Sequence, residues 1–123
     1  MHKDERGTIA SVYLNRLKKG MKLQADPTSK YASGNFALRR ITSEQTSLKS
    51  PYNTYYVSGL PIGPICTPQQ STIDAVLDAP STDYLFFSAR SDGSGYHNFS
   101  ATYGQHQQNA AQYHESLNKR NIH

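Results

Sequence analysis

Residues 59–64, with the sequence Gly-Leu-Pro-Ile-Gly-Pro, are the feature that most constrains how this chain can fold. The prolines lack the backbone N–H that helices and strands use, and the glycines favour turns. Neither kind of regular structure can continue through this segment. Helices and strands must therefore be sought separately on its two sides.

Before this segment, the first element is predicted to be a helix over about residues 4–19. Apolar side chains recur with the period of about 3.6 residues typical of a helix that is buried on one face. They are Ile9, Val12, Tyr13 and Leu17. Gly20 follows two lysines and is placed to end the helix in a left-handed conformation. This pattern predicts one helix with one buried side.

Residues 21–25 alternate apolar and polar and predict a short strand that exposes Gln24. Asp26 and Pro27 then suit the N-cap and first position of a helical turn that reaches Tyr31.

Two further pairs of residues have the spacing of a capping box, Thr42 with Gln45 and Thr67 with Gln70. The first predicts a short helix. The second predicts a helix over residues 68–78 that points its apolar residues inward. Those residues are Ile73, Val76 and Leu77.

The Tyr- and Val-rich residues 53–57 favour a strand. Residues 84–89 and 96–100 flank a turn-forming Asp-Gly-Ser-Gly sequence and predict a hairpin. A closing helix is expected over residues 102–118. Helices and strands in this order indicate the α+β class, and 123 residues suit a single domain.

Composition excludes several functions. The net charge is +4, but the basic residues are scattered, which argues against a nucleic-acid binder. A single cysteine, Cys66, allows neither an internal disulfide nor a cysteine-based metal cluster. The five histidines lack metal-ligand spacing and no phosphate-binding loop is present, so we expect neither a metal nor a cofactor.

The remaining polar residues suggest a carbohydrate site. Asn15 interrupts an amphipathic helix, Gln24 and Asp26 share the exposed side of a predicted strand, and residues 51–55 mix amide and aromatic groups. Sugars offer hydroxyls for hydrogen bonds and C–H faces for stacking on aromatic rings. Each residue also has a local interpretation, because Asn15 and Asn53 could cap backbone groups and Asp26 could be an N-cap.

Five strings of this sequence together resemble the YceG-like (MltG) family of endolytic peptidoglycan transglycosylases. They are ERGTIASVYLNRLKKGMKLQADPT, SPYNTYYVSGLPIGPI, TPQQSTIDAVLDAP, DYLFFSA and GYHNFSATYGQH. Their order and spacing are similar to the family pattern over nearly the whole chain. Ala25, Ile62 and Gln69 depart from that pattern, which has Thr, Pro and Gly at the matching positions. An older family label, aminodeoxychorismate lyase, is set aside because no pyridoxal phosphate site is evident.

The resemblance implies an α+β fold with a lysozyme-like, transglycosylase-related cleft. It also implies cleavage of the glycan strand between N-acetylmuramic acid and N-acetylglucosamine, with a 1,6-anhydro product. The positions that match substrate-binding roles are Asn15, Gln24, Asp26, Tyr52, Asn53, Thr54 and Tyr55. We expect Gln24, Asp26, Asn53 and Tyr55 to converge on one concave surface near the start of the first helix.

The family's catalytic glutamate lies six positions before the residue matched by Glu5, upstream of Met1. We therefore expect residues 1–123 to be a catalytic domain truncated at its N-terminal side, with no catalytic residue of its own and no activity. The resemblance implies that the parent has a LysM-like module and a membrane anchor. It would face the periplasm or exterior, acting on peptidoglycan with the cell-wall synthesis machinery. The alternative is a glycan-binding module without chemistry.

Overall fold

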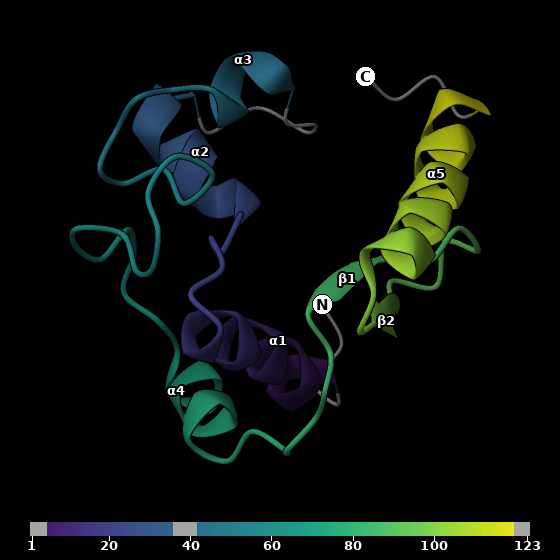
Figure 1. Cartoon of the computed structure of the whole chain (residues 1–123), viewed down its shortest axis with the longest axis horizontal. Helices are drawn as coiled ribbons and strands as arrows, with labels where there is room; N and C mark the ends of the chain where they lie inside the picture. The colour runs from purple at the N-terminus through teal and green to yellow at the C-terminus, as the bar shows by residue number, and fades with distance from the viewer. Residues whose placement is uncertain (1–4, 36–41, 120–123) are drawn as a thin grey trace. The chain divides into compact units, whose positions relative to one another are not determined.

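The structure is a computed structural model that describes residues 5–35 and 42–119 (Figure 1). Its elements follow one another as α1 (Arg6–Lys18), α2 (Asp26–Ser33), α3 (Ser43–Thr46), α4 (Gln70–Leu77), β1 (Phe86–Ala89), β2 (His97–Ser100) and α5 (Tyr103–Lys119). This confirms the α+β class. Residue 4, where the first helix was predicted to begin, lies outside the described residues.

The contacts divide the chain into two compact units. The first comprises the described residues of Met1–Asn15 and Pro68–His123, and the second comprises those of Arg16–Thr67. Within the residues that the structure describes, none of the helices has the combined length and apolarity that a membrane crossing requires.

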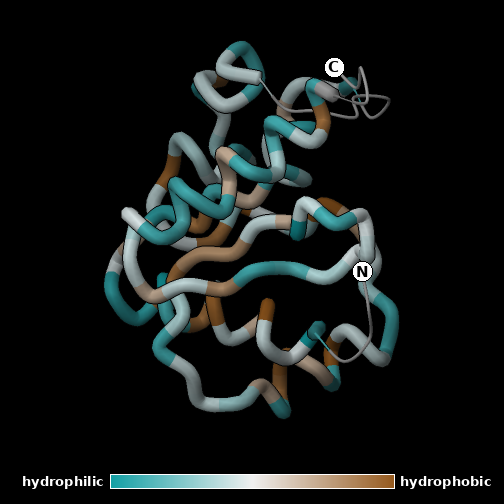
Figure 2. The backbone as a smooth tube through the Cα atoms, turned by 90° about the vertical axis from the view of Figure 1, so that its right-hand side faces the viewer, coloured by the Kyte–Doolittle hydropathy of each residue, from teal (hydrophilic) through white to brown (hydrophobic). Residues whose placement is uncertain are grey.

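The first unit is built around the hairpin. Strands β1 and β2 pair antiparallel in the register Phe87 opposite Phe99, which confirms the predicted hairpin. Alternate residues of a strand point to opposite faces. On one face the Phe87 ring meets Tyr13 of α1 edge-on, and on the other the Phe86 ring stacks on His106 of α5. Figure 2 shows hydrophobic residues around β1 and largely hydrophilic ones along α5.

The predicted stripe of α1 is the main apolar core of the first unit. Ile9 and Val12 are buried, with 5% and 1% of their surface exposed, and Leu117 of α5 is also buried. Gly7 lies where a Cβ would come within 3.2 Å of the Pro80 ring, so a small residue allows this close approach. Tyr13 and Leu17 of the predicted stripe are half-buried, whereas Ser11 and Arg16 are buried, so the periodicity identified only part of the buried side of α1.

The second unit begins as α1 ends. Gly20 has a φ of 70°, as the sequence predicted for a helix-ending glycine. The buried Arg16 guanidinium donates a 2.6 Å hydrogen bond to the carbonyl oxygen of Lys22, which ties the next segment back to the helix. Leu23 is buried between the exposed Lys22 and Gln24, as the alternation predicted.

Two predicted strands of this unit are wrong. Residues 21–25 form only one parallel bridge, between Lys22 and Gly59, because Gln24 adopts a left-handed backbone conformation. Residues 53–57 form a turn, in which the Asn53 carbonyl accepts hydrogen bonds from the N–H groups of Tyr56 and Val57. These local bonds replace the ladder that β-propensity favoured.

The observed helix caps match one of the predicted caps and differ from two others. The Thr42 capping box is present, and the Gln45 side chain accepts from the Thr42 N–H at 3.1 Å. Asp26, in contrast, is the first helical residue of α2, and Ala25 is its N-cap. Helix α4 begins after Gln69, so the predicted Thr67 cap is wrong.

The predicted inward face of α4 is also wrong. Ile73, Val76 and Leu77 are 40%, 44% and 77% exposed. Their spacing places them on one face of the helix, but spacing alone does not decide whether that face finds a partner.

Candidate functional site

Gln24 has the most unusual backbone among the candidate residues. Its φ is 51°, and it is the one non-glycine residue with positive φ in the part of the chain that the structure describes. The left-handed region is costly for a residue with a Cβ and persists where neighbouring contacts enforce it. The Gln24 side chain is exposed. The strained conformation therefore directs the Gln24 side-chain amide toward solvent.

Thr54 supplies the contacts that enforce this conformation. Its carbonyl oxygen accepts from the Gln24 N–H at 3.2 Å, and its hydroxyl accepts from the Ala25 N–H at 2.9 Å. The hydroxyl of Thr28 lies 2.8 Å from that of Thr54 and donates to the Ala25 carbonyl at 2.6 Å. Thr28 and Thr54 are 5% and 0% exposed. The segment before α2 thus rests on a buried hydroxyl pair.

Asp26 and Tyr55 form an exposed polar contact next to this segment. The Tyr55 hydroxyl donates to Asp26 Oδ1 at 2.5 Å. Asp26 is exposed and Tyr55 half-buried, so both polar groups are accessible from solvent. The amide of Gln24, the carboxylate of Asp26 and the phenol of Tyr55 provide both donors and acceptors, as binding a polyhydroxylated ligand requires.

Asn53 is a structural residue of this unit. Its Oδ1 accepts from the Ser29 hydroxyl at 2.8 Å and from the Tyr55 N–H at 3.1 Å. Its Nδ2 donates to the Leu48 carbonyl at 2.8 Å and the Thr46 carbonyl at 3.1 Å. The side chain has no exposed surface. A direct contact of Asn53 or Thr54 with a ligand conflicts with this burial, and both can serve a site only by holding its neighbours.

Tyr52 packs against Tyr31, with ring centroids 4.9 Å apart and the rings tilted by 51°. A Cβ added to Gly63 would come within 3.6 Å of the Tyr52 hydroxyl oxygen, so the ring also lies near the proline-containing segment. Tyr52 is half-buried. It supports the turn that carries Asn53 to Tyr55.

Asn15 belongs to the first unit. Its Nδ2 donates to the carbonyl oxygens of Thr82 at 2.8 Å and Tyr84 at 2.9 Å. The local, structural interpretation of this amide therefore fits the structure, because it secures the chain that leads into β1.

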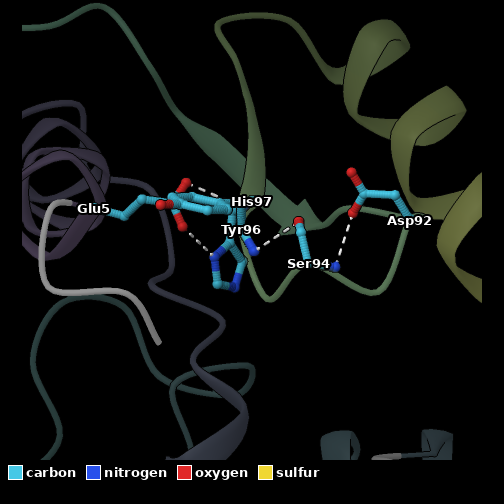
Figure 3. A network of polar contacts seen from close by, with 5 residues as sticks. All are labelled: Glu5, Asp92, Ser94, Tyr96 and His97. Carbon is cyan, nitrogen blue, oxygen red and sulfur yellow. Dashed lines mark hydrogen bonds and ion pairs between the residues drawn. The ribbon is translucent and has the colours of Figure 1, made fainter.

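A second polar contact, which was not predicted from the sequence, joins Glu5 and His97 (Figure 3). The Glu5 carboxylate accepts from the His97 N–H at 3.0 Å, and its other oxygen lies 3.0 Å from His97 Nδ1. Burial acts to raise the pKa of Glu5, but the hydrogen bonds from His97 outweigh it and the pKa is lowered. The two residues are 92 positions apart, and no local pattern connects them.

The same network continues into the hairpin turn. The Asp92 carboxylate accepts from the Ser94 N–H at 2.9 Å (Figure 3). Hydrogen bonds from the Ser94 side chain and from its N–H lower the pKa of Asp92. The Ser94 hydroxyl in turn accepts from the Tyr96 N–H. Among the residues that the structure describes, no group of three or more His, Cys, Asp or Glu is arranged to hold a metal ion.

Comparison with known proteins identifies the class. A solved structure of a yceG-like protein from Listeria monocytogenes superposes with a TM-score of 0.75 and 43% identity, covering 81% of this chain and 32% of that one. A Bacillus subtilis (strain 168) protein named endolytic murein transglycosylase is 42% identical over 118 residues, which is 96% of this chain and 32% of the relative. A protein of the same name from Streptococcus pneumoniae serotype 2 is 34% identical over 90 residues, 70% of this chain and 16% of the relative.

This protein therefore shares the α+β fold of the Listeria structure. The YceG-like family model matches residues 1–112, and the chain belongs to that family. It spans about a third of the length of the Bacillus relative.

Proposed function

We propose that this chain is part of an endolytic murein transglycosylase and contributes a surface that binds the glycan strand of peptidoglycan. The observation that carries the proposal is the 42% identity, over 96% of the chain, to the Bacillus subtilis protein of that name. The exposed polar groups of Gln24, Asp26 and Tyr55 support it, because they offer the donors and acceptors that sugar hydroxyls and N-acetyl groups need.

The reaction needs one general acid. It protonates the glycosidic oxygen while the bond from that oxygen to C1 of N-acetylmuramic acid breaks. The C6 hydroxyl of the same sugar attacks C1 and returns its proton to the conjugate base, so a 1,6-anhydro end forms without water. Such an acid works best with a raised pKa, as in glycosidases whose acid lies in an apolar pocket.

Neither Glu5 nor Asp26 suits that role. The pKa of Glu5 is lowered by its hydrogen bonds from His97, which favours the ionised form. Asp26 is exposed and accepts a hydrogen bond from Tyr55, so it lacks the apolar surroundings of such an acid. We propose that the acid is a glutamate in a segment that precedes these 123 residues, and that this chain alone does not turn over.

The remaining candidate residues have supporting roles in this proposal. Asn53 and Thr54 hold the backbone of the binding surface from beneath, and Tyr52 packs behind it. Asn15 secures the chain before β1. The parent protein is proposed to be anchored in the cytoplasmic membrane, facing the periplasm or exterior, and to work with the machinery that synthesises the wall.

The activity is tested by incubating purified sacculi with this chain and with a longer form extended upstream. Mass spectrometry of the digests measures 1,6-anhydromuropeptides. We expect them from the longer form only, and loss of them when the upstream glutamate is changed to glutamine. Products from the 123-residue chain at the rate of the longer form would contradict the proposal. Glycan binding by both forms with no product from either would favour a non-catalytic binding module.

The binding surface is tested with Tyr55→Phe. Losing the hydroxyl that bonds to Asp26 should weaken binding of soluble glycan strands about three- to tenfold, the effect of one hydrogen bond. The matched control is Tyr56→Phe, since the neighbouring Tyr56 is 48% exposed and lies outside the proposed surface. Calorimetric titration measures both affinities. Equal affinities for the two variants would exclude Tyr55 from the surface.

A further inference from the structure

The hydroxyl groups of Thr28 and Thr54 can be assigned one complete set of hydrogen bonds. Each hydroxyl has a single proton to donate. The Thr28 proton goes to the Ala25 carbonyl at 2.6 Å, so the Thr54 proton must fill the 2.8 Å contact between the two hydroxyls. The Thr54 oxygen then accepts from the Ala25 N–H, and the Thr28 oxygen accepts from the Thr54 N–H at 3.1 Å. In this arrangement both hydroxyl protons and the N–H groups of Ala25 and Thr54 each have an acceptor.

The result is a closed ring that joins the 53–56 turn to the residues before α2. It is buried, where hydrogen bonds are strong and unpaired donors are costly. The ring fixes both backbone groups of Ala25, and the Thr54 carbonyl fixes the N–H of Gln24. These bonds lie on either side of the strained φ of Gln24 and oppose its return to an extended conformation.

We propose that Thr28 and Thr54 are positioning residues that keep Gln24 left-handed and set its amide beside Asp26 and Tyr55 for glycan binding. The binding part of this inference rests on the proposed function. The backbone part does not. Neither threonine touches the ligand, because each is buried. Their effect on affinity passes through the backbone of residues 24–26.

The experiment compares Thr54→Val, which removes the hydroxyl and keeps the shape, with Thr54→Ser, which keeps the hydroxyl. Thr72→Val, at an exposed position of α4, is the matched control. The first measurement is the nuclear Overhauser effect between the amide and α protons of Gln24, which is strong when φ is positive. We expect it to weaken in Thr54→Val and to return in Thr54→Ser. Thr28→Val also removes one hydroxyl of the ring. If Thr54→Val does not fold, the Overhauser effect of Gln24 in Thr28→Val tests the proposal.

The second measurement is the affinity for soluble, uncrosslinked glycan strands by calorimetric titration. We expect about tenfold weaker binding for Thr54→Val, with Thr54→Ser and Thr72→Val close to the unchanged chain. An undiminished Overhauser effect in folded Thr54→Val or Thr28→Val would overturn the inference. So would an unchanged affinity in a variant that has lost the effect. If the unchanged chain binds no glycan, the proposed function fails, and the Overhauser measurement still decides the backbone part.

Discussion

Gln24 is the residue at which backbone strain and a candidate functional side chain coincide. A left-handed conformation typically costs a residue with a Cβ about 1–2 kcal/mol relative to glycine. The Thr54 carbonyl and hydroxyl bond to the N–H groups of Gln24 and Ala25, and these bonds offset that cost. A strained residue held by buried partners is common at functional sites, so the conformation itself supports a role for Gln24.

We predict that Gln24→Gly and Gln24→Ala differ in stability although both remove the amide. Glycine adopts a positive φ without strain but loses more entropy on folding, whereas alanine keeps the strain. Gln24→Gly should therefore be more stable than Gln24→Ala by about 0.5–1 kcal/mol, measured by urea unfolding. Lower stability of the glycine variant would mean that the backbone is not left-handed in solution. Both variants should bind glycan more weakly than the unchanged chain.

At the scale of elements, the carboxylate of Glu5 joins the start of α1 to β2. It accepts from both the main chain and the ring of His97, and it is only 8% exposed. Tyr13, two turns further along α1, packs edge-on against Phe87 of the paired strand. The helix is thus held to one face of the hairpin by a polar contact at its start and an aromatic contact in its middle.

The lowered pKa of Glu5 predicts how stability depends on pH. A carboxylate whose pKa is lower in the folded chain contributes stability above its ordinary value of 4.5, and this contribution is lost as pH falls through the lowered value. Glu5→Gln should cost about 1.5–3 kcal/mol at pH 7, typical of a hydrogen bond to a charged group. The difference from the unchanged chain should shrink below pH 4.5.

Urea unfolding across this pH range measures the effect. The matched control is Glu44→Gln, because Glu44 is an exposed residue of α3 and should change stability little at any pH. A cost of Glu5→Gln that stays constant from pH 7 to pH 3 would show that the charge of Glu5 does not contribute.

At the scale of the whole molecule, apolar residues with the same helical spacing have opposite environments. Val12 of α1 is 1% exposed, whereas Leu77 of α4 is 77% exposed. Removal of apolar surface from water is the main stabilising contribution to folding. A buried residue such as Val12 therefore adds substantially to stability, and an exposed residue such as Leu77 does not.

We therefore predict that Val12→Ala destabilises the chain by about 2 kcal/mol, through lost burial and the cavity that remains. Leu77→Ala should change the free energy of unfolding by less than about 0.5 kcal/mol, as is usual at exposed positions. Thermal unfolding and urea titration measure both. A cost for Leu77→Ala comparable to that of Val12→Ala would show that the apolar face of α4 is covered in solution.

Much of the fold could be predicted from short patterns in the sequence. The stripe from Ile9 to Leu17 identified α1, Gly20 marked its end, and the Asp-Gly-Ser-Gly turn between two aromatic runs identified the hairpin. These patterns succeed because helix periodicity, glycine caps and hairpin turns depend on residues close together in the chain. The family resemblance could also be recognised from the sequence, because its motifs are short continuous segments of the chain.

What only the tertiary structure decided depends on residues distant in the chain. Residues 53–57 have strand-forming side chains, but Asn53 bonds to Ser29 and Leu48 and turns the segment instead. The left-handed Gln24 depends on Thr54, 30 positions later by their numbering, and the pKa of Glu5 depends on His97. The sequence by itself determined which elements form and to which family the chain is similar. Burial, strain and ionisation were decided by tertiary contacts, because each is set by the atoms that surround a group after folding.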